Sequence, residues 1–143
     1  MRVFIIGDRR WDDEVAIKQV LQHFNSRDKF IMCKHYKTVG LVDLTSKWLG
    51  KFHFKKELLE IFYTSGSNDM FRQIGQYLAL SNVDLVIIFY DGWQTSTLMK
   101  LTVNTCRRLN IQCVNIHHNN DNLAIQEWLH PSESKHSEEF VDS

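Results

Sequence analysis

The stretch "VDLVIIFYDGWQTSTLMK", residues 83–100, passes from a buried strand into a helix within a few residues. Val83–Tyr90 is a short, continuous apolar run, which is typical of parallel strands that are covered on both faces. The run stops at Asp91-Gly92, where turn residues begin, and a helical pattern opens near Thr97. A buried strand that leads directly into a helix is one unit of an α/β fold with a parallel sheet.

The same unit recurs along the chain. Four further strand-like runs lie at Arg2–Ile6, Lys29–Cys33, Glu57–Tyr63 and Ile111–Ile116. Helical periodicity fills the intervals between them, and a last short helix is expected over Asn122–Leu129 with Asp121 as its cap. The alternation predicts a three-layer Rossmann-like domain with a mostly parallel sheet of about five strands.

The helix boundaries follow from capping residues and apolar stripes. Asp12 or Asp13 can cap the first helix, and Asp43 marks the expected start of the second. The third helix presents one apolar stripe, made of Met70, Ile74, Tyr77 and Leu78. The fourth helix is expected to present another stripe, made of Leu98, Leu101 and Thr105.

Length and composition exclude several classes of protein. The 143 residues suit one domain, which we place at residues 1–130, and the polar, acidic residues 131–143 are expected to form a flexible tail. The formal net charge is zero, which argues against nucleic-acid binding. No apolar stretch approaches the ~20 residues of a membrane helix, and three cysteines without metal-ligand spacing indicate buried, reduced thiols. We therefore expect a cytoplasmic protein without membrane contact.

Ligands of open parallel sheets bind at the carboxyl ends of the strands. The first strand ends in "GDRRWDD", where Gly7 and Asp8 form a turn, Arg9 and Arg10 offer donors for phosphate, and Trp11 offers a stacking face. A surface turn with two solvated arginines explains the same residues, and we leave both interpretations open.

The second strand is followed by a polar, aromatic loop. Tyr36 and Lys37 could stack a base and bind phosphate, while Gly40 and Asp43 stand at the expected helix start. An exposed loop with a capping aspartate is the alternative.

The fourth strand ends in the stretch quoted first. Asp91, Gly92, Thr95, Ser96 and Thr97 precede or open a helix whose first turn has unpaired N–H groups and a partial positive charge. Capping explains one hydroxyl, whereas three in a row favour an anion site.

Arg72 is a further candidate, because it lies early in the third helix near Gly75; a solvated arginine is the alternative. His117 and His118 are interpreted as surface residues, since no carboxylate is spaced to share a metal with them. No cofactor or metal is expected.

Three segments together resemble the YspA-like proteins of the SLOG superfamily. The opening "MRVFIIGDRRWDDEVAIKQVL" is similar to a start of the type MRVLVTGSRDWTD, and "VGLVDLTSKW" is similar to the segment that carries a GARGAD pattern. The stretch from residue 83 to residue 116 is similar to a closing strand, a DG-x-S-x-GT loop, a helix and a final strand.

The resemblance implies a Rossmann-like fold related to the LOG phosphoribohydrolases and a nucleotide or ADP-ribose-like signalling ligand. It assigns a ligand-binding role by motif position to Gly7, Asp8, Arg9, Gly40, Asp43, Arg72, Asp91, Gly92, Thr95, Ser96 and Thr97. It also implies a homodimer or a higher homo-oligomer. A role in sensing or sequestering the ligand follows, and a viral sponge for a host immune signal is one form of it.

The chain departs from that family at three points, one of which is Ser96 in place of a glycine in the third loop. The tandem glycines of the second loop are replaced by the stretch from His35 to Thr38, and the glutamate of the hydrolase pattern GTxxE is replaced by Lys100. A lysine cannot act as the catalytic carboxylate, which favours binding over hydrolysis. Two alternatives remain open: a nucleoside-phosphate N-glycosidase or phosphohydrolase that uses another carboxylate, with Asp8, Asp43 and Asp91 as the candidates, and a protein-interaction module with a degenerate site.

Overall fold

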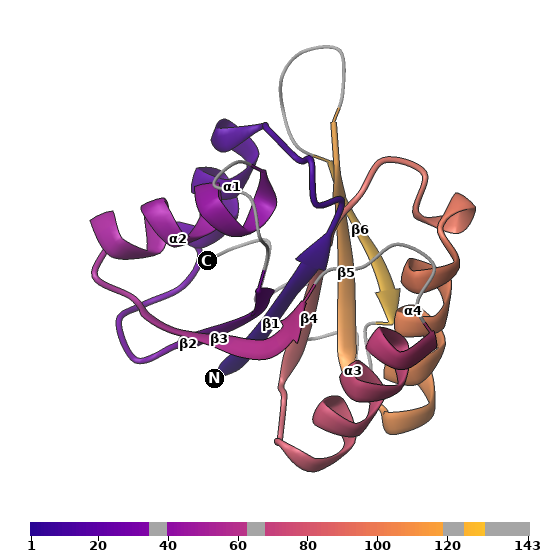
Figure 1. The fold of residues 1–143 in the computed structure, drawn as a ribbon. Helices are drawn as coiled ribbons and strands as arrows, with labels where there is room; N and C mark the ends of the chain where they lie inside the picture. Colours follow the sequence, from indigo (N-terminus) through magenta and orange to yellow (C-terminus); the bar gives the residue numbers. More distant parts are fainter. Residues whose placement is uncertain (35–39, 63–67, 119–124, 131–143) are drawn as a thin grey trace.

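The computed structural model describes residues 1–34, 40–62, 68–118 and 125–130, and Figure 1 shows their arrangement. A single six-stranded sheet has the order β3-β2-β1-β4-β5-β6. Its strands are β1 (Arg2–Gly7), β2 (Lys29–Lys34), β3 (Lys55–Phe62), β4 (Leu85–Phe89), β5 (Gln112–His117) and β6 (Ile125–His130). The first five are parallel, and β6 pairs with β5 in the antiparallel direction. This is the Rossmann order, in which the chain switches direction across the sheet between β1 and β4.

Helices cover both faces of the sheet, as the sequence predicts. The helices α1 (Glu14–Leu21) and α2 (Leu41–Lys51) lie on one face, and α3 (Asn68–Leu80) and α4 (Thr97–Leu109) lie on the other (Figure 1). Within the part of the chain that the structure describes, no helix combines the length and the apolar character that crossing a membrane requires.

The two covered faces explain why the strands are continuously apolar. Val3 and Ile5 of β1 pack toward α1 and α2, whereas their neighbours Phe4 and Ile6 pack toward α3 and α4. All four side chains are buried. Successive residues of a strand point to opposite faces, so burial on both faces requires apolar residues at consecutive positions of β1.

The predicted helix starts are right in two cases and wrong in one. Asp13 caps α1 by accepting a hydrogen bond from the Ala16 N–H (3.1 Å), and Ser96 caps α4 by accepting from the Met99 N–H (3.2 Å). The helix α2 begins two residues before Asp43, with Gly40 as its N-cap at φ 98°. Asp43 therefore lies in the first turn, where its charge complements the helix dipole without capping it.

The buried stripe of α4 is displaced from the predicted one. Leu98 and Leu101 are only partly buried, while Met99, Thr102, Val103 and Cys106 face the core together with Thr105. The hydroxyls of Thr102 and Thr105 donate to the carbonyl oxygens of Leu98 and Leu101, at 2.8 and 2.9 Å. These bonds satisfy the two hydroxyls inside the helix, which allows threonine to occupy core positions.

The prediction of a last helix over Asn122–Leu129 is wrong, whereas the mostly parallel sheet of about five strands is confirmed, with one antiparallel strand added at its edge. The segment Ile125–His130 is the strand β6, which raises the number of strands to six. Trp128 packs toward the core on the side of α1 and α2, while Leu129 packs toward the opposite core. Neighbouring residues on opposite faces are typical of a strand, and β5 supplies the pairing partner. Residues 131–143, the predicted tail, lie outside the described residues.

Replacing Gly40 by alanine should destabilise the protein by more than about 1 kcal/mol, because φ 98° disfavours a side chain and a Cβ would lie 1.9 Å from the Arg9 carbonyl oxygen. Gly50→Ala is the matched control, since Gly50 lies in α2 where an added Cβ would meet no other group within 4 Å. That change should stabilise the protein by about 0.5–1 kcal/mol. Urea denaturation of both variants measures the difference, and equal midpoints would contradict it.

Candidate functional site

The carboxyl ends of β1 and β4 meet at the switch point of the sheet. The Asp8 N–H donates to the Phe89 carbonyl oxygen at 2.8 Å, directly after Gly7 has paired with Phe89. A Cβ on Gly7 would lie 2.2 Å from that same oxygen. Gly7 therefore allows close approach of the protein's own backbone, and the loops after β1 and β4 emerge side by side.

A second glycine joins the loop after β1 to the start of α2. The Leu41 N–H donates to the Arg9 carbonyl oxygen at 3.2 Å, and Gly40 lies against the backbone of Arg9. The predicted site residues Gly7, Arg9 and Gly40 are thus brought together. Tyr36 and Lys37, which were predicted to belong to the same site, lie outside the described residues.

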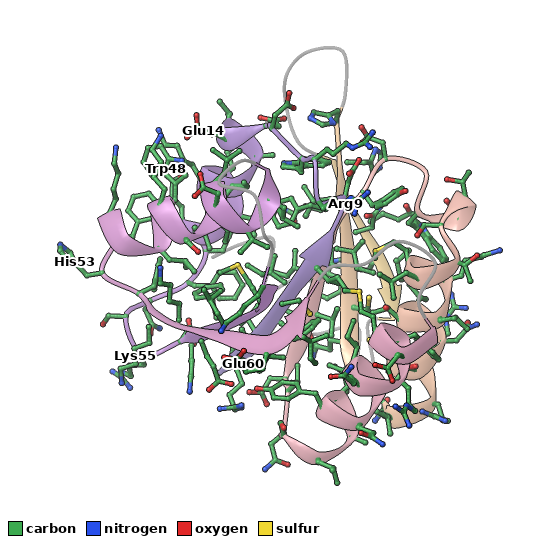
Figure 2. All side chains as sticks on the ribbon, in the orientation of Figure 1. Arg9, Glu14, Trp48, His53, Lys55 and Glu60 are labelled. Carbon is green, nitrogen blue, oxygen red and sulfur yellow. The ribbon has the colours of Figure 1, made fainter. Side chains whose placement is uncertain are left out.

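The two arginines after β1 carry the positive charge at this edge. Arg9 is partly buried and lies just beyond the end of β1 (Figure 2), while Arg10 is exposed. The Asp8 carboxylate accepts a hydrogen bond from the Arg10 N–H at 2.9 Å and so holds the turn. Within residues 1–34, 40–62, 68–118 and 125–130, neither guanidinium makes an ion pair or a side-chain hydrogen bond. Both side chains keep donors available for an anion.

His118 bridges the loops after β1 and β4. Its Nδ1 lies 2.6 Å from Asp91 Oδ2, and its Nε2 lies 3.2 Å from Asp13 Oδ2. Its backbone N–H also donates to Asp91 Oδ1 at 2.8 Å. The imidazole ring stacks on Trp11 with 4.1 Å between the ring centres. A carboxylate only accepts hydrogen bonds, so the ring can donate to both aspartates only in its doubly protonated form.

This arrangement corrects two interpretations of the sequence. Trp11 is 3% exposed, it makes an edge-type contact with Phe89 and one of its faces is covered by His118, so its ring is not open to a base. His118 is exposed, as predicted, but two carboxylates flank it. Its partners come from loops 27 and 105 residues away in the sequence, so local spacing could not reveal them. His118 directly follows β5, and polar residues at the carboxyl ends of parallel strands are candidate site residues. This position is the one sequence signal that could have identified it.

The carboxylate of Asp91 is held in its charged form. Partial burial would raise its pKa, but the hydrogen bonds from the ring and the backbone N–H of His118, together with the charges of His118 and His117, lower it below the ordinary value of 3.8. The loop after β4 thus starts with an anion that is already paired by the protein.

Local hydrogen bonds account for two of the three hydroxyls in the predicted phosphate loop. Gly92 adopts φ 65° before the short 3₁₀ helix η1 (Trp93–Thr95), and the Thr95 hydroxyl donates to the Gly92 carbonyl oxygen at 2.7 Å. The Ser96 hydroxyl caps α4. Thr97 is exposed at the first position of α4, where amide groups lack partners within the helix. Lys100, three residues further along α4, is also exposed.

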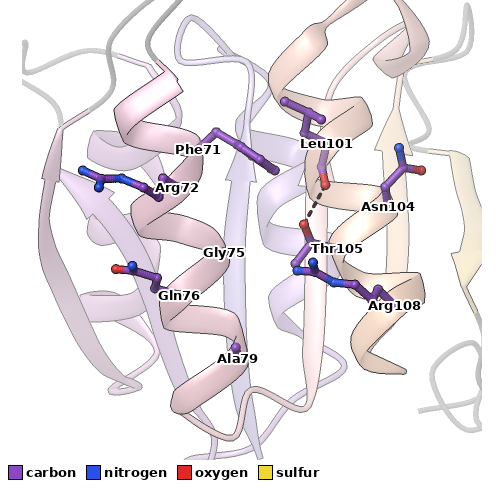
Figure 3. Close-up of a pocket in the computed structure, with 9 residues that line it drawn as sticks. All are labelled: Phe71, Arg72, Gly75, Gln76, Ala79, Leu101, Asn104, Thr105 and Arg108. Carbon is purple, nitrogen blue, oxygen red and sulfur yellow. Dashed lines mark hydrogen bonds between the residues drawn. The ribbon is translucent and has the colours of Figure 1, made fainter.

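Arg72 lies in a different feature of the surface. Its guanidinium pairs with Asp69, one turn earlier on α3. It also lines a groove of about 460 Å³ between α3 and α4, together with Phe71, Gly75 and Arg108 (Figure 3). None of the lining residues belongs to the loops after β1 and β4. Asp43 is exposed in the first turn of α2. No group of three or more metal-ligating side chains occurs in the described part of the chain.

The fold defines the chain as a Rossmann-like α/β protein. A solved structure that resembles it is that of Anabaena Alr3699/HepE in complex with UDP, with 10% sequence identity and a TM-score of 0.46. The match covers 80% of this chain and 29% of the other, so this chain spans less than a third of that protein's length. No protein-family model and no curated protein matches the sequence. A likeness of this extent says nothing about the ligand of this chain.

Replacing His118 by alanine should lower the free energy of unfolding by about 1 kcal/mol, because two charge-assisted contacts and a ring stack are lost at a partly exposed position. His117→Ala is the matched control, because its Nδ1 reaches the adjacent His118 carbonyl oxygen and its ring takes part in neither bridging contact. Urea denaturation at pH 6 measures both. Equal losses would show that the bridge does not hold the loops.

The stabilisation from Asp91 should depend on pH. A carboxylate whose pKa is lower in the folded state contributes stability above its unfolded pKa, and this contribution disappears as the pH falls through the folded value. Asp91→Asn should therefore cost about 0.5–1 kcal/mol at pH 7 and lose most of this effect well below pH 3.8. Denaturation midpoints of the two proteins at both pH values measure it, and a constant difference would contradict it.

Proposed function

We propose that this chain binds a nucleotide or a nucleotide-derived ligand at the carboxyl edge of the sheet. The observation that carries the proposal is the pair of guanidinium groups, Arg9 and Arg10, which find no partner among the described residues. They belong to the loop after β1, which begins beside the end of β4 at the switch point of the sheet. Ligands of open α/β sheets bind at this point.

The phosphates of the ligand would lie between the loop after β1 and the first turn of α4. Arg9 and Arg10 would neutralise them, and the Thr97 hydroxyl with the first amides of α4 would donate hydrogen bonds. Two guanidinium groups match the charge of a diphosphate. Tyr36 and Lys37 would contribute from the loop before Gly40.

The resemblance to the SLOG superfamily supports an ADP-ribose-like signalling molecule as the ligand. In that case the protein would sense or sequester the signal in the cytoplasm, as a homodimer or a larger homo-oligomer. A viral protein that removes a host immune signal would have this activity without any catalytic step.

Binding is favoured over hydrolysis by the carboxylates near the site. Asp8 accepts from the Arg10 N–H and Asp91 is engaged by His118, so both are already hydrogen-bonded within the protein. Lys100 stands where the LOG pattern carries its glutamate. Two of the three carboxylates considered for an N-glycosidase step are thus engaged within the protein, while Asp43 is exposed in the first turn of α2.

A non-enzymatic interaction module is the second candidate, and the bridge of His118 favours it. Its stack on Trp11 covers the ring that would otherwise receive a base. In this case the closed edge would be a rigid protein surface, and no nucleotide would bind there.

A thermal-shift screen with ADP-ribose, ADP, UDP and NAD tests the proposal. A ligand at 100 times its Kd should add about 2.7 kcal/mol to the free energy of unfolding, which raises the melting temperature measurably. The double variant Arg9→Glu/Arg10→Glu should lose the shift, because two donors become two repelling carboxylates.

The matched control is Arg27→Glu, an exposed arginine after α1 at the opposite edge of the sheet, which should keep the shift. No shift with any of the four compounds would favour the interaction module. A shift that survives in Arg9→Glu/Arg10→Glu would place the ligand elsewhere, and release of free base during incubation would favour the N-glycosidase.

A further inference from the structure

Three lysines surround a single tryptophan on the outer surface of α1 and α2. The Nζ atoms of Lys18 and Lys51 each lie 4.6 Å from the centre of the Trp48 ring, and that of Lys47 lies 5.3 Å away. Figure 2 shows Trp48 on α2 beside Glu14 at the start of α1. We call these five residues the Trp48 cluster.

Glu14 is the one carboxylate of the Trp48 cluster. Glu14 Oε1 accepts from Lys47 Nζ at 2.7 Å and from Trp48 Nε1 at 3.0 Å. The hydrogen bonds from Lys47 and Trp48 lower the pKa of Glu14, so it is an anion at neutral pH. Among the described residues, neither Lys18 nor Lys51 has a carboxylate oxygen within 4.0 Å of its Nζ, although the charge of Lys51 helps to lower the pKa of Glu14. The cluster therefore keeps a surplus of two positive charges.

The charge of the chain is divided unequally along its length. Residues 131–143, "PSESKHSEEFVDS", contain four acidic residues and one lysine, a net charge of −3. Since the whole chain has a net charge of zero, residues 1–130 carry +3. The acidic surplus lies in one short segment, and the Trp48 cluster is a basic surface without enough carboxylates of its own.

We propose that residues 131–143 dock on the Trp48 cluster of the same chain. The acidic side chains of Glu138 and Glu139 pair with Lys18 and Lys51, while the ammonium groups keep their contacts with the Trp48 ring. Phe140 follows directly and contacts the aromatic surface that Trp48 shares with Phe52, whose rings lie 5.6 Å apart. The ligand of this surface is thus an acidic peptide with one aromatic anchor.

The geometry of the fold permits this contact. The strand β6 is antiparallel, so His130 lies opposite Cys113 near the start of β5, at the amino end of the parallel strands. The helix α2 runs back toward the same end and leads into β3. Four strand spacings of about 4.8 Å and a helix layer about 10 Å away give a span of about 22 Å. Eight residues from His130 to Glu138 reach about 26 Å when extended.

Covalent attachment explains how a weak contact can be populated. Single exposed ion pairs are individually weak, but a short connection holds the two surfaces at a millimolar effective concentration. The contact depends on charge, so it must weaken as salt screens the lysines. This dependence separates it from a contact made by Phe140 alone.

A spin label at the end of this segment tests the proposal. The variant Ser143→Cys accepts the label selectively, because Cys33, Cys106 and Cys113 are buried. In NMR spectra at about 20 mM salt, the paramagnetic label should weaken the amide signals of residues 47–52. The signals should recover in about 1 M NaCl, where the Debye length is about 3 Å.

Two charge reversals identify the surface. Lys18→Glu/Lys51→Glu should restore the signals of residues 47–52 at low salt, whereas Lys100→Glu, an exposed lysine on the opposite helix layer, should leave them reduced. Undiminished signals in the labelled protein at low salt would overturn the proposal, and so would signals that Lys18→Glu/Lys51→Glu does not restore. A mixing experiment separates contacts within one chain from contacts between copies. Isotope-labelled protein without a spin label is mixed with spin-labelled protein that carries no isotope. If the isotope-labelled protein loses the same signals, the contact forms between copies and the intrachain proposal is wrong.

Discussion

The contact between the end of β1 and the backbone of β4 is the constraint on which the carboxyl edge depends. Gly7 has no side chain, and a Cβ there would lie within 2.2 Å of the Phe89 carbonyl oxygen. The backbone at the end of β1 therefore lies directly against β4. The loop after β1 then lies close to both the start of α2 and the loop after β4. A wider separation would leave His118 without one of its two carboxylates, since Asp13 belongs to the first loop and Asp91 to the second.

The same closeness has two opposite consequences for ligand binding. It places the loop that carries Arg9 and Arg10 at the switch point, between the end of β4 and the start of α2. It also lets the protein fill part of that point with its own stacked rings of Trp11 and His118. In the proposed function, a ligand would use the arginines and the start of α4, or would displace His118 from Trp11. The choice between a nucleotide-binding protein and an interaction module depends on which of these consequences dominates.

Charge is distributed over this molecule with little relation to its net value of zero. Asp8, Asp13 and Asp91 are engaged by backbone N–H groups or by His118, and the two arginines have no ion-pair partner among the described residues. On the outer surface of α1 and α2, three lysines share one glutamate. The protein therefore has two separate cationic surfaces although its net charge is zero. A neutral composition is compatible with an anionic ligand on one surface and an acidic peptide on the other.

The sequence alone determined the α/β class, the five parallel strands and the four main helices, because burial on both faces demands continuous apolar runs and caps are read from adjacent residues. It also located Gly7, Arg9 and Gly40, which meet in space. Only the tertiary structure decided that Ile125–His130 is a strand, because the unpaired edge of β5 supplies its hydrogen bonds. The tertiary structure also decided the contacts at the candidate site. The Thr95 hydroxyl donates within its own turn and the Ser96 hydroxyl caps α4, while His118 contacts Asp13 and Asp91, which lie in two other loops. Sequence patterns reveal interactions between residues that are close in the chain, such as helix caps and turns. The contacts of β6 and His118 join segments that are distant in the chain and that only the folded sheet brings together.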